Sequence, residues 1–250
     1  MSRTVDECLR DVLNYHNPLT GEEMSLPFRV FYPSDYDEKT GKQYPMLFFL
    51  HGHGECGTNN EFQIRVLQKP NELLDRVIAS DAAIIVAPQC PCRPPEYEWV
   101  RLNHVWNTGS REKLDETPTV AMQAAIALLD SFLENPKVDK KRVYAAGISM
   151  GGYGAWELVT RRPEVFAAIM PVCGAGFPGY ADKLKSVAAW IFHGEADGTV
   201  PAGGAHEMEA ALRAVGADVR VTYYPGVGHD SWIPAYKEPD LLDWLFSKHQ

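Results

Sequence analysis

The sequence Gly147-Ile148-Ser149-Met150-Gly151 constrains the fold more than any other feature of the chain. An apolar run at residues 143–146 precedes it and predicts a buried strand, and apolar residues at helical spacing follow it. The G-x-S-x-G spacing is typical of a nucleophile elbow, a sharp strand-to-helix turn that holds a serine hydroxyl clear of a sheet. Glycine is needed two residues to either side, because a side chain there would collide with the turn or the facing helix. The motif therefore predicts Ser149 as a nucleophile.

The rest of the chain predicts an α/β fold with a mostly parallel sheet and helices on both faces. Apolar runs predict further strands at residues 45–50, 82–87, 166–173, 188–193 and 219–224. Periodic patterns predict helices at residues 72–79, 119–133, 206–215 and 240–246. Towards the N-terminus we expect a helix at 5–13, an outer strand at 26–32 and helical structure near 62–67. A chain of 250 residues without repeats or linkers is expected to form one domain, 1–250.

Charge and composition exclude several classes of partner. The net charge is −9 and no basic cluster occurs, which argues against nucleic acid and against anionic membranes as partners. The N-terminal residues lack the apolar core of a signal peptide, so a cytoplasmic protein is expected, or a secreted one if a leader was removed. The cysteines are five in number and scattered, so thiols rather than disulfides are expected.

Four polar residues follow predicted strands, at the sheet edge where open α/β sheets bind ligands: Ser149, Asp197, His229 and His53. A serine hydroxyl needs a base within hydrogen-bond reach, and His229 is the best candidate. The imidazole must in turn be held by a carboxylate, for which Asp197 is suited. The chain order Ser, Asp, His is the one known for nucleophile-elbow hydrolases. Ser149, Asp197 and His229 are therefore the predicted catalytic triad.

Other acids and histidines are alternative candidates for the same roles. Glu195 and Asp230 are alternative acids, but Glu195 lies closer to its strand and Asp230 adjoins the histidine itself. His51 and His193 each precede a glycine at a strand end, where packing or local hydrogen bonding is expected. The pair His51-x-His53 could hold a metal, but no acidic or thiolate cluster joins it. No metal or other cofactor is predicted.

The loop His51-Gly52-His53-Gly54 is expected to supply half of an oxyanion hole. Acyl transfer passes through a tetrahedral oxyanion that two backbone N–H groups stabilise. One donor is the residue after the nucleophile, Met150, and the other lies in the loop after an earlier strand. The N–H of His53 is the predicted second donor, with that of Gly54 next.

An irregular stretch at residues 88–118 is long for a compact domain unless it serves a site. We expect it to form a substrate wall or lid. Trp99 and Trp106 are the candidates to stack against an aromatic acyl group or a sugar, with core or loop anchoring as the alternative role.

Taken together, these motifs resemble the α/β-hydrolase superfamily. The resemblance is to its small serine carboxylesterases, the branch of feruloyl and acetylxylan esterases and polyhydroxybutyrate-depolymerase-like esterases. It rests on residues 48–55, 87–91, 147–152, 193–201 and 228–229. It implies the same triad and oxyanion hole. Two features depart from that branch: Cys56 stands where related loops often carry arginine, and no signal peptide is visible. Dienelactone hydrolases share the fold but use a cysteine nucleophile, where this chain has Ser149.

The predicted function is that of a serine carboxylesterase working through an acyl-enzyme, without a cofactor. Candidate substrates are small-molecule or oligosaccharide-linked esters, such as feruloyl or acetyl esters of plant polysaccharides. One alternative is a peptidase of the prolyl-oligopeptidase type, which normally carries a large gating domain. The other is a non-catalytic binding protein with the hydrolase fold.

Overall fold

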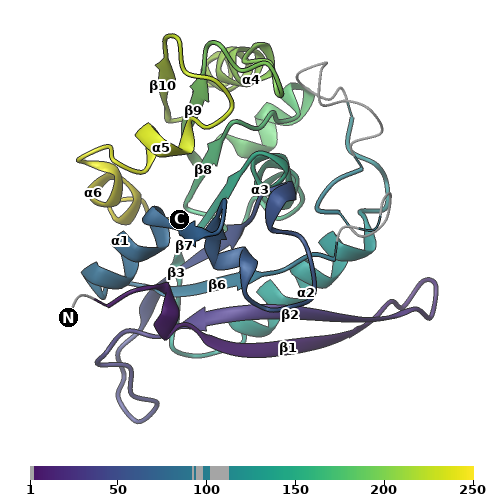
Figure 1. Cartoon of the computed structure of the whole chain (residues 1–250), viewed down its shortest axis with the longest axis vertical. Helices are drawn as coiled ribbons and strands as arrows, with labels where there is room; N and C mark the ends of the chain where they lie inside the picture. Colours follow the sequence, from purple (N-terminus) through teal and green to yellow (C-terminus); the bar gives the residue numbers. More distant parts are fainter. Residues whose placement is uncertain (1–2, 92, 94–97, 102–112) are drawn as a thin grey trace.

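A computed structural model describes residues 3–91, 93, 98–101 and 113–250. Its central feature is an eight-stranded sheet in the order β1-β2-β6-β3-β7-β8-β9-β10 (Figure 1). The strands are β1 (Leu9–His16), β2 (Glu23–Phe31), β3 (Tyr44–Leu50), β6 (Ile84–Pro88), β7 (Val138–Ile148), β8 (Ala168–Val172), β9 (Ala188–Gly194) and β10 (Val219–Tyr224). From β6 to β10 all neighbouring strands are parallel, whereas β2 pairs antiparallel with both β1 and β6. The carboxyl ends of six strands therefore lie at one edge of the sheet.

Helices cover both faces of the sheet (Figure 1). One face packs against α2 (Val120–Leu133), α3 (Met150–Arg161), α4 (Gly203–Ala214) and the 3-10 segment η5 (Pro178–Leu184). The other face packs against α1 (Glu72–Ser80), α5 (Trp232–Ala235) and α6 (Leu241–Phe246). Because β3 is covered on both sides, all seven of its residues are buried.

The predicted α/β architecture with a mostly parallel sheet is confirmed. Two local predictions are wrong. Residues 5–13 form not a helix but the 3-10 turn η1 (Val5–Glu7) and the edge strand β1, because pairing with β2 overrides the helix-like spacing of Leu9, Val12 and Leu13. Residues 62–67 form the 3-10 turn η3 (Phe62–Ile64) and the first strand of a small hairpin, β4 (Arg65–Val66) with β5 (Lys69–Pro70). Among the described residues, no helix combines the length and the apolar character that a bilayer crossing requires.

The junction of β7 and α3 is packed backbone to backbone. A Cβ atom on Gly151 would lie 2.0 Å from the carbonyl oxygen of Leu50, at the end of β3. A Cβ atom on Gly147 would lie 2.1 Å from the carbonyl oxygen of Gly151. The two glycines of the motif therefore allow α3 to start directly against the end of the central strand, as the spacing predicts.

This packing predicts a large difference between two Gly→Ala variants. Gly151→Ala places a methyl group on backbone atoms that no side-chain rotation can move, so we expect it to destabilise the fold by about 3 kcal/mol. Gly203→Ala, at the start of α4, has open space around the new atom and should change stability by less than about 1 kcal/mol. Urea unfolding of both variants measures the difference. Equal midpoints would contradict the packing argument.

Candidate active site

Ser149 occupies the turn between β7 and α3 in a strained backbone conformation. Its φ is 52° and its ψ is −119°, in the region that normally favours glycine. Its N–H donates to the carbonyl oxygen of Val172 in β8 at 2.9 Å, which ties the turn to the neighbouring strand. Strain of this kind persists only where the surroundings hold it, and it concentrates at functional sites.

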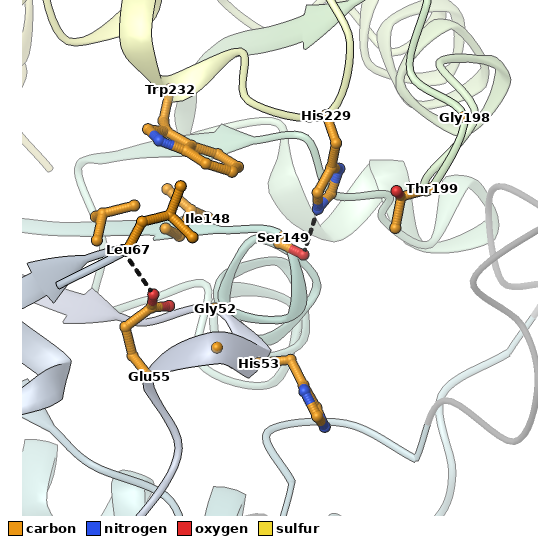
Figure 2. A pocket seen from close by; sticks show the side chains of 12 residues that line it. Gly52, His53, Glu55, Leu67, Ile148, Ser149, Gly198, Thr199, His229 and Trp232 are labelled. Carbon is orange, nitrogen blue, oxygen red and sulfur yellow. Dashed lines mark hydrogen bonds between the residues drawn. The ribbon is translucent and has the colours of Figure 1, made fainter.

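The structure brings the three predicted triad residues together. Nε2 of His229 lies 2.9 Å from Oγ of Ser149, and Nδ1 of His229 lies 2.8 Å from Oδ2 of Asp197. Figure 2 shows the imidazole of His229 directed at the serine oxygen. The three side chains come from the carboxyl ends of β7, β9 and β10, although 80 residues separate Ser149 from His229. A hydroxyl, an imidazole and a carboxylate are thus hydrogen-bonded in series.

The environment of Asp197 fixes the protonation of this series. Burial alone would raise the pKa of Asp197, but hydrogen bonds from His193, His229 and the N–H groups of Val200 and Thr199 outweigh it and hold the pKa well below its usual range. An ionised carboxylate can only accept, so Nδ1 of His229 carries the proton and Nε2 is left to accept from Ser149. This is the tautomer that a general base for the serine requires.

A second histidine supports the carboxylate from inside the protein. The fully buried Nε2 of His193 lies 2.8 Å from the carbonyl oxygen of Val200 and 3.3 Å from Oδ2 of Asp197. Both neighbours are acceptors, so Nε2 carries the proton and donates to them. The sequence predicts local hydrogen bonding for His193 but does not reveal that one of its partners is Asp197, the predicted triad acid. Of the alternative acids, Glu195 instead lies 3.3 Å from His206, and neither Glu195 nor Asp230 is bonded to Nδ1 of His229.

The loop after β3 lies beside the serine, and His51 holds its shape. Nδ1–H of His51 donates to the carbonyl oxygen of Gly52 at 2.7 Å, and Nε2 accepts from the N–H of Cys90 at 3.0 Å. Burial lowers the pKa of His51 to about 4, so the ring is neutral and can fill both roles. His53 follows as the first residue of the 3-10 turn η2 (His53–Glu55), with its side chain turned away from Ser149 (Figure 2).

Met150 is the first residue of α3, where backbone N–H groups have no acceptor within the helix. Both predicted oxyanion donors therefore belong to segments that flank Ser149: α3 begins directly after it, and the loop of His53 lines the same cavity as the serine. The roles of these two N–H groups stay predictions.

A cavity of about 620 Å³ opens above the serine and the imidazole. One part of it is apolar and is lined by Ile148, Leu67 and Trp232, with the carboxyl group of Glu55 at its floor (Figure 2). The indole of Trp232 stands edge-on to the ring of His229, with the ring centroids 5.7 Å apart. Neither Trp232 nor Leu67 was predicted to line the site, because each lies on a short element that the sequence pattern does not reveal.

The predicted substrate wall is changed by the structure. Trp99 is fully buried, and its Nε1–H donates to the carbonyl oxygen of His51 at 3.1 Å, so the predicted stacking role of Trp99 is wrong and it anchors the loop instead. Trp106 lies outside the described residues, as does much of segment 88–118.

The prediction that the cysteines are thiols is wrong for Cys56, which is disulfide-bonded, whereas Cys8, Cys90 and Cys173 are thiols.

Comparison with known proteins places this site in a family. Residues 105–235, more than half of the chain, match the dienelactone hydrolase family. The chain belongs to the dienelactone hydrolase family. This match confirms the predicted carboxylic ester hydrolase of the α/β-hydrolase superfamily. In this member of the family the elbow residue is a serine, Ser149, and not a cysteine.

Three similar proteins show how much of each relative the chain represents. It is 24% identical over 236 residues to lysophospholipase-like protein 1 of Mus musculus, covering 90% of this chain and 95% of the relative. It is 29% identical over 211 residues to an endo-1,4-beta-xylanase/feruloyl esterase of Xylanibacter ruminicola, covering 80% of this chain but 26% of the relative. The chain is also similar to the crystal structure of a thermostable esterase, with 32% identity and a TM-score of 0.83, and the match covers 99% of this chain and 64% of the esterase chain. The chain thus spans a part of the last two proteins.

The low pKa of Asp197 predicts a pH-dependent contribution to stability. The hydrogen bonds to its carboxylate stabilise the fold fully above the unfolded-state pKa of about 3.9, and this contribution is lost as the pH falls through the lower folded-state pKa. We therefore expect the unfolding free energy to fall more steeply between about pH 4 and pH 2 in the wild type than in Asp197→Asn. Urea titrations at stepped pH measure both slopes, and parallel curves would contradict the assignment.

Proposed function

We propose that the protein is a serine carboxylesterase that uses Ser149 as nucleophile, His229 as base and acid, and Asp197 as the group that orients the imidazole. The observation that carries the proposal is the hydrogen-bonded series of these three side chains at the base of an open cavity. The family match supports hydrolysis as the reaction class. Both contacts are within the hydrogen-bond distance that proton transfer requires.

In the first half-reaction, Oγ of Ser149 attacks the ester carbonyl carbon while Nε2 of His229 takes the hydroxyl proton. The tetrahedral oxyanion accepts hydrogen bonds from the N–H groups of His53 and Met150. The carbon–oxygen bond to the alcohol then breaks, and the imidazolium returns its proton to the leaving alkoxide. Asp197 remains ionised and stabilises the transient charge on His229.

In the second half-reaction, water replaces the alcohol. The water oxygen attacks the acyl carbon while His229 takes a proton from the water. The bond between the acyl carbon and Oγ of Ser149 then breaks, and His229 returns the proton to Oγ. The products are the free acid and the resting enzyme. No atom in either half-reaction requires a metal or an organic cofactor.

The cavity supports an ester with an apolar organic group as substrate. Its apolar part contains an aromatic side chain, Trp232, next to aliphatic Ile148, and a cavity of about 620 Å³ is of the size that holds small organic ligands. Similarity to the xylanase/feruloyl esterase supports feruloyl or acetyl esters of plant polysaccharides as the natural class. We also propose that the chain forms one hydrolase domain, since all the parallel strands share one sheet.

The test is ester hydrolysis by the wild type and by Ser149→Ala. We expect the wild type to hydrolyse p-nitrophenyl acetate and methyl ferulate, and the substitution to lower kcat/KM by about 10⁴-fold or more, because no other group replaces the nucleophile. Ser131→Ala is the matched control: that hydroxyl donates within α2, away from the cavity, and activity should be kept. Undiminished turnover by Ser149→Ala would contradict the mechanism.

The same assay separates the alternatives. A prolyl-peptide substrate that is cleaved faster than any ester would favour the peptidase. A wild type that turns over no ester in a panel with acetylated xylan and with short and long acyl chains would favour the binding protein.

The disulfide at Cys56 supports the secreted alternative over the cytoplasmic one, because disulfides persist in oxidising compartments. We expect Cys56 of protein from its native source to react with iodoacetamide only after reduction. Alkylation of Cys56 without reductant would favour a reducing compartment.

A further inference from the structure

The tip of the small β4–β5 hairpin is built from residues that do not favour its conformation. Leu67 and Gln68 join the two strands, and their φ angles are 49° and 66°. Two-residue hairpin loops with positive φ at both central positions strongly prefer glycine and asparagine, because a Cβ atom crowds the backbone there. Neither residue is glycine or asparagine, so the backbone of the tip is strained at two adjacent positions.

Burial of the Leu67 side chain offsets little of this strain. It is 65% exposed, so most of its apolar surface remains in contact with water. Yet it lies at the rim of the cavity that contains Ser149 and His229, near Ile148 and Trp232 (Figure 2). Backbone strain that packing does not explain points to a role for the residue in function.

A buried carboxyl group fixes the tip in place. Glu55 is 5% exposed, and its Oε1 accepts a hydrogen bond from the N–H of Leu67 at 3.3 Å (Figure 2). The same side chain lies under the loop of His53: a Cβ atom on Gly52 would come within 3.0 Å of its Oε2. Burial raises the pKa of Glu55, so the carboxyl group sits in a site that disfavours its charge. Glu55 therefore connects the hairpin tip to the predicted oxyanion loop.

A second cavity adjoins the first at Leu67, and its lining combines apolar side chains with the charged residues Lys69, Glu72 and Lys237. This cavity of about 320 Å³ shares Val66, Leu67 and Trp232 with the first. It extends past Ile233, which is 45% exposed. Leu67 thus lines both the catalytic cavity and an outer groove, and an apolar group that extends from one into the other would contact it.

We propose that Leu67 is a specificity-determining residue that contacts an extended apolar group of the ester, and that Glu55 positions it. The proposal rests on the proposed esterase function. The group that contacts Leu67 is an alkyl or aryl group on either the acyl or the alcohol side of the ester.

The test compares Leu67→Gly with Gln68→Gly. Both variants remove a side chain from a positive-φ position of the same turn, so we expect both to unfold at a higher temperature than the wild type. Gln68 does not line the catalytic cavity, and its variant should keep the substrate preference of the wild type. In Leu67→Gly, the ratio of kcat/KM for long substrates to kcat/KM for short substrates should fall about tenfold, because the apolar group of a long substrate loses its contact with the leucine side chain. Leu67→Asn, which also fits the turn, should behave in the same way.

Two substrate series distinguish the two sides of the ester. The first is p-nitrophenyl acetate, butyrate and octanoate, and the second is methyl and benzyl acetate. A lower preference in either series for Leu67→Gly, without a change for Gln68→Gly, supports the proposal and identifies the side. Equal ratios in wild type and Leu67→Gly in both series would overturn it. If wild-type turnover depends on Ser149 while the ratios stay equal, this inference alone fails; if turnover does not depend on Ser149, the proposed function fails.

The positioning role of Glu55 has its own readout. Glu55→Ala should lower the long-to-short ratio as Leu67→Gly does, whereas Glu55→Gln keeps an acceptor oxygen and should restore it. In the double variant with Leu67→Gly, the alanine should change the ratio no further, because the two residues act through one wall. Additive effects on the ratio would show that Glu55 acts independently of Leu67.

Discussion

The close approach of two backbones, at the end of β3 and the start of α3, is the contact on which the rest of the site depends. With glycine at position 151, the first turn of α3 lies against the carbonyl oxygens of Leu50 and His51. This contact sets the spacing between Ser149 and the loop that carries His53. The loop is fixed on its other side by the neutral ring of His51 and by Trp99. Position, rather than any unusual side chain, is what makes an ordinary serine a candidate nucleophile.

Asp197 and His229 are brought together by the same kind of contact. A Cβ atom on Gly194, at the end of β9, would lie 2.3 Å from the carbonyl oxygen of Gly228 and 2.4 Å from that of Val227. The loop that carries Asp197 therefore touches the loop that carries His229, and the N–H of Ala196 donates to the carbonyl oxygen of Val227 at 2.9 Å. Two glycine contacts thus hold together the three predicted triad residues, which are distant in sequence.

The residues that lie next to these close backbone contacts could be predicted from the sequence. Residues whose positions depend on other tertiary contacts could not. Ser149, Asp197 and His229 each follow an apolar strand and have glycines nearby in the sequence. This local pattern is enough to predict them as a triad. Trp99 could not be placed, because an indole can stack on a ligand or anchor a loop and only tertiary contacts decide. The β4–β5 hairpin was missed because its turn carries Leu67 and Gln68 instead of the residues that usually mark such a turn.

Two strained residues face the cavity, and they are held in different ways. Ser149 is 8% exposed and is surrounded by β8, α3 and the loop after β3, so a change in its conformation would disturb the sheet itself. Leu67 is exposed and is held at its N–H by the carboxyl group of Glu55. A substitution at the hairpin tip can therefore alter the shape of the cavity without moving the serine. The fold separates the residues of the proposed chemistry from the proposed specificity residue, because the first follow strands of the central sheet and the second lies on a hairpin outside it.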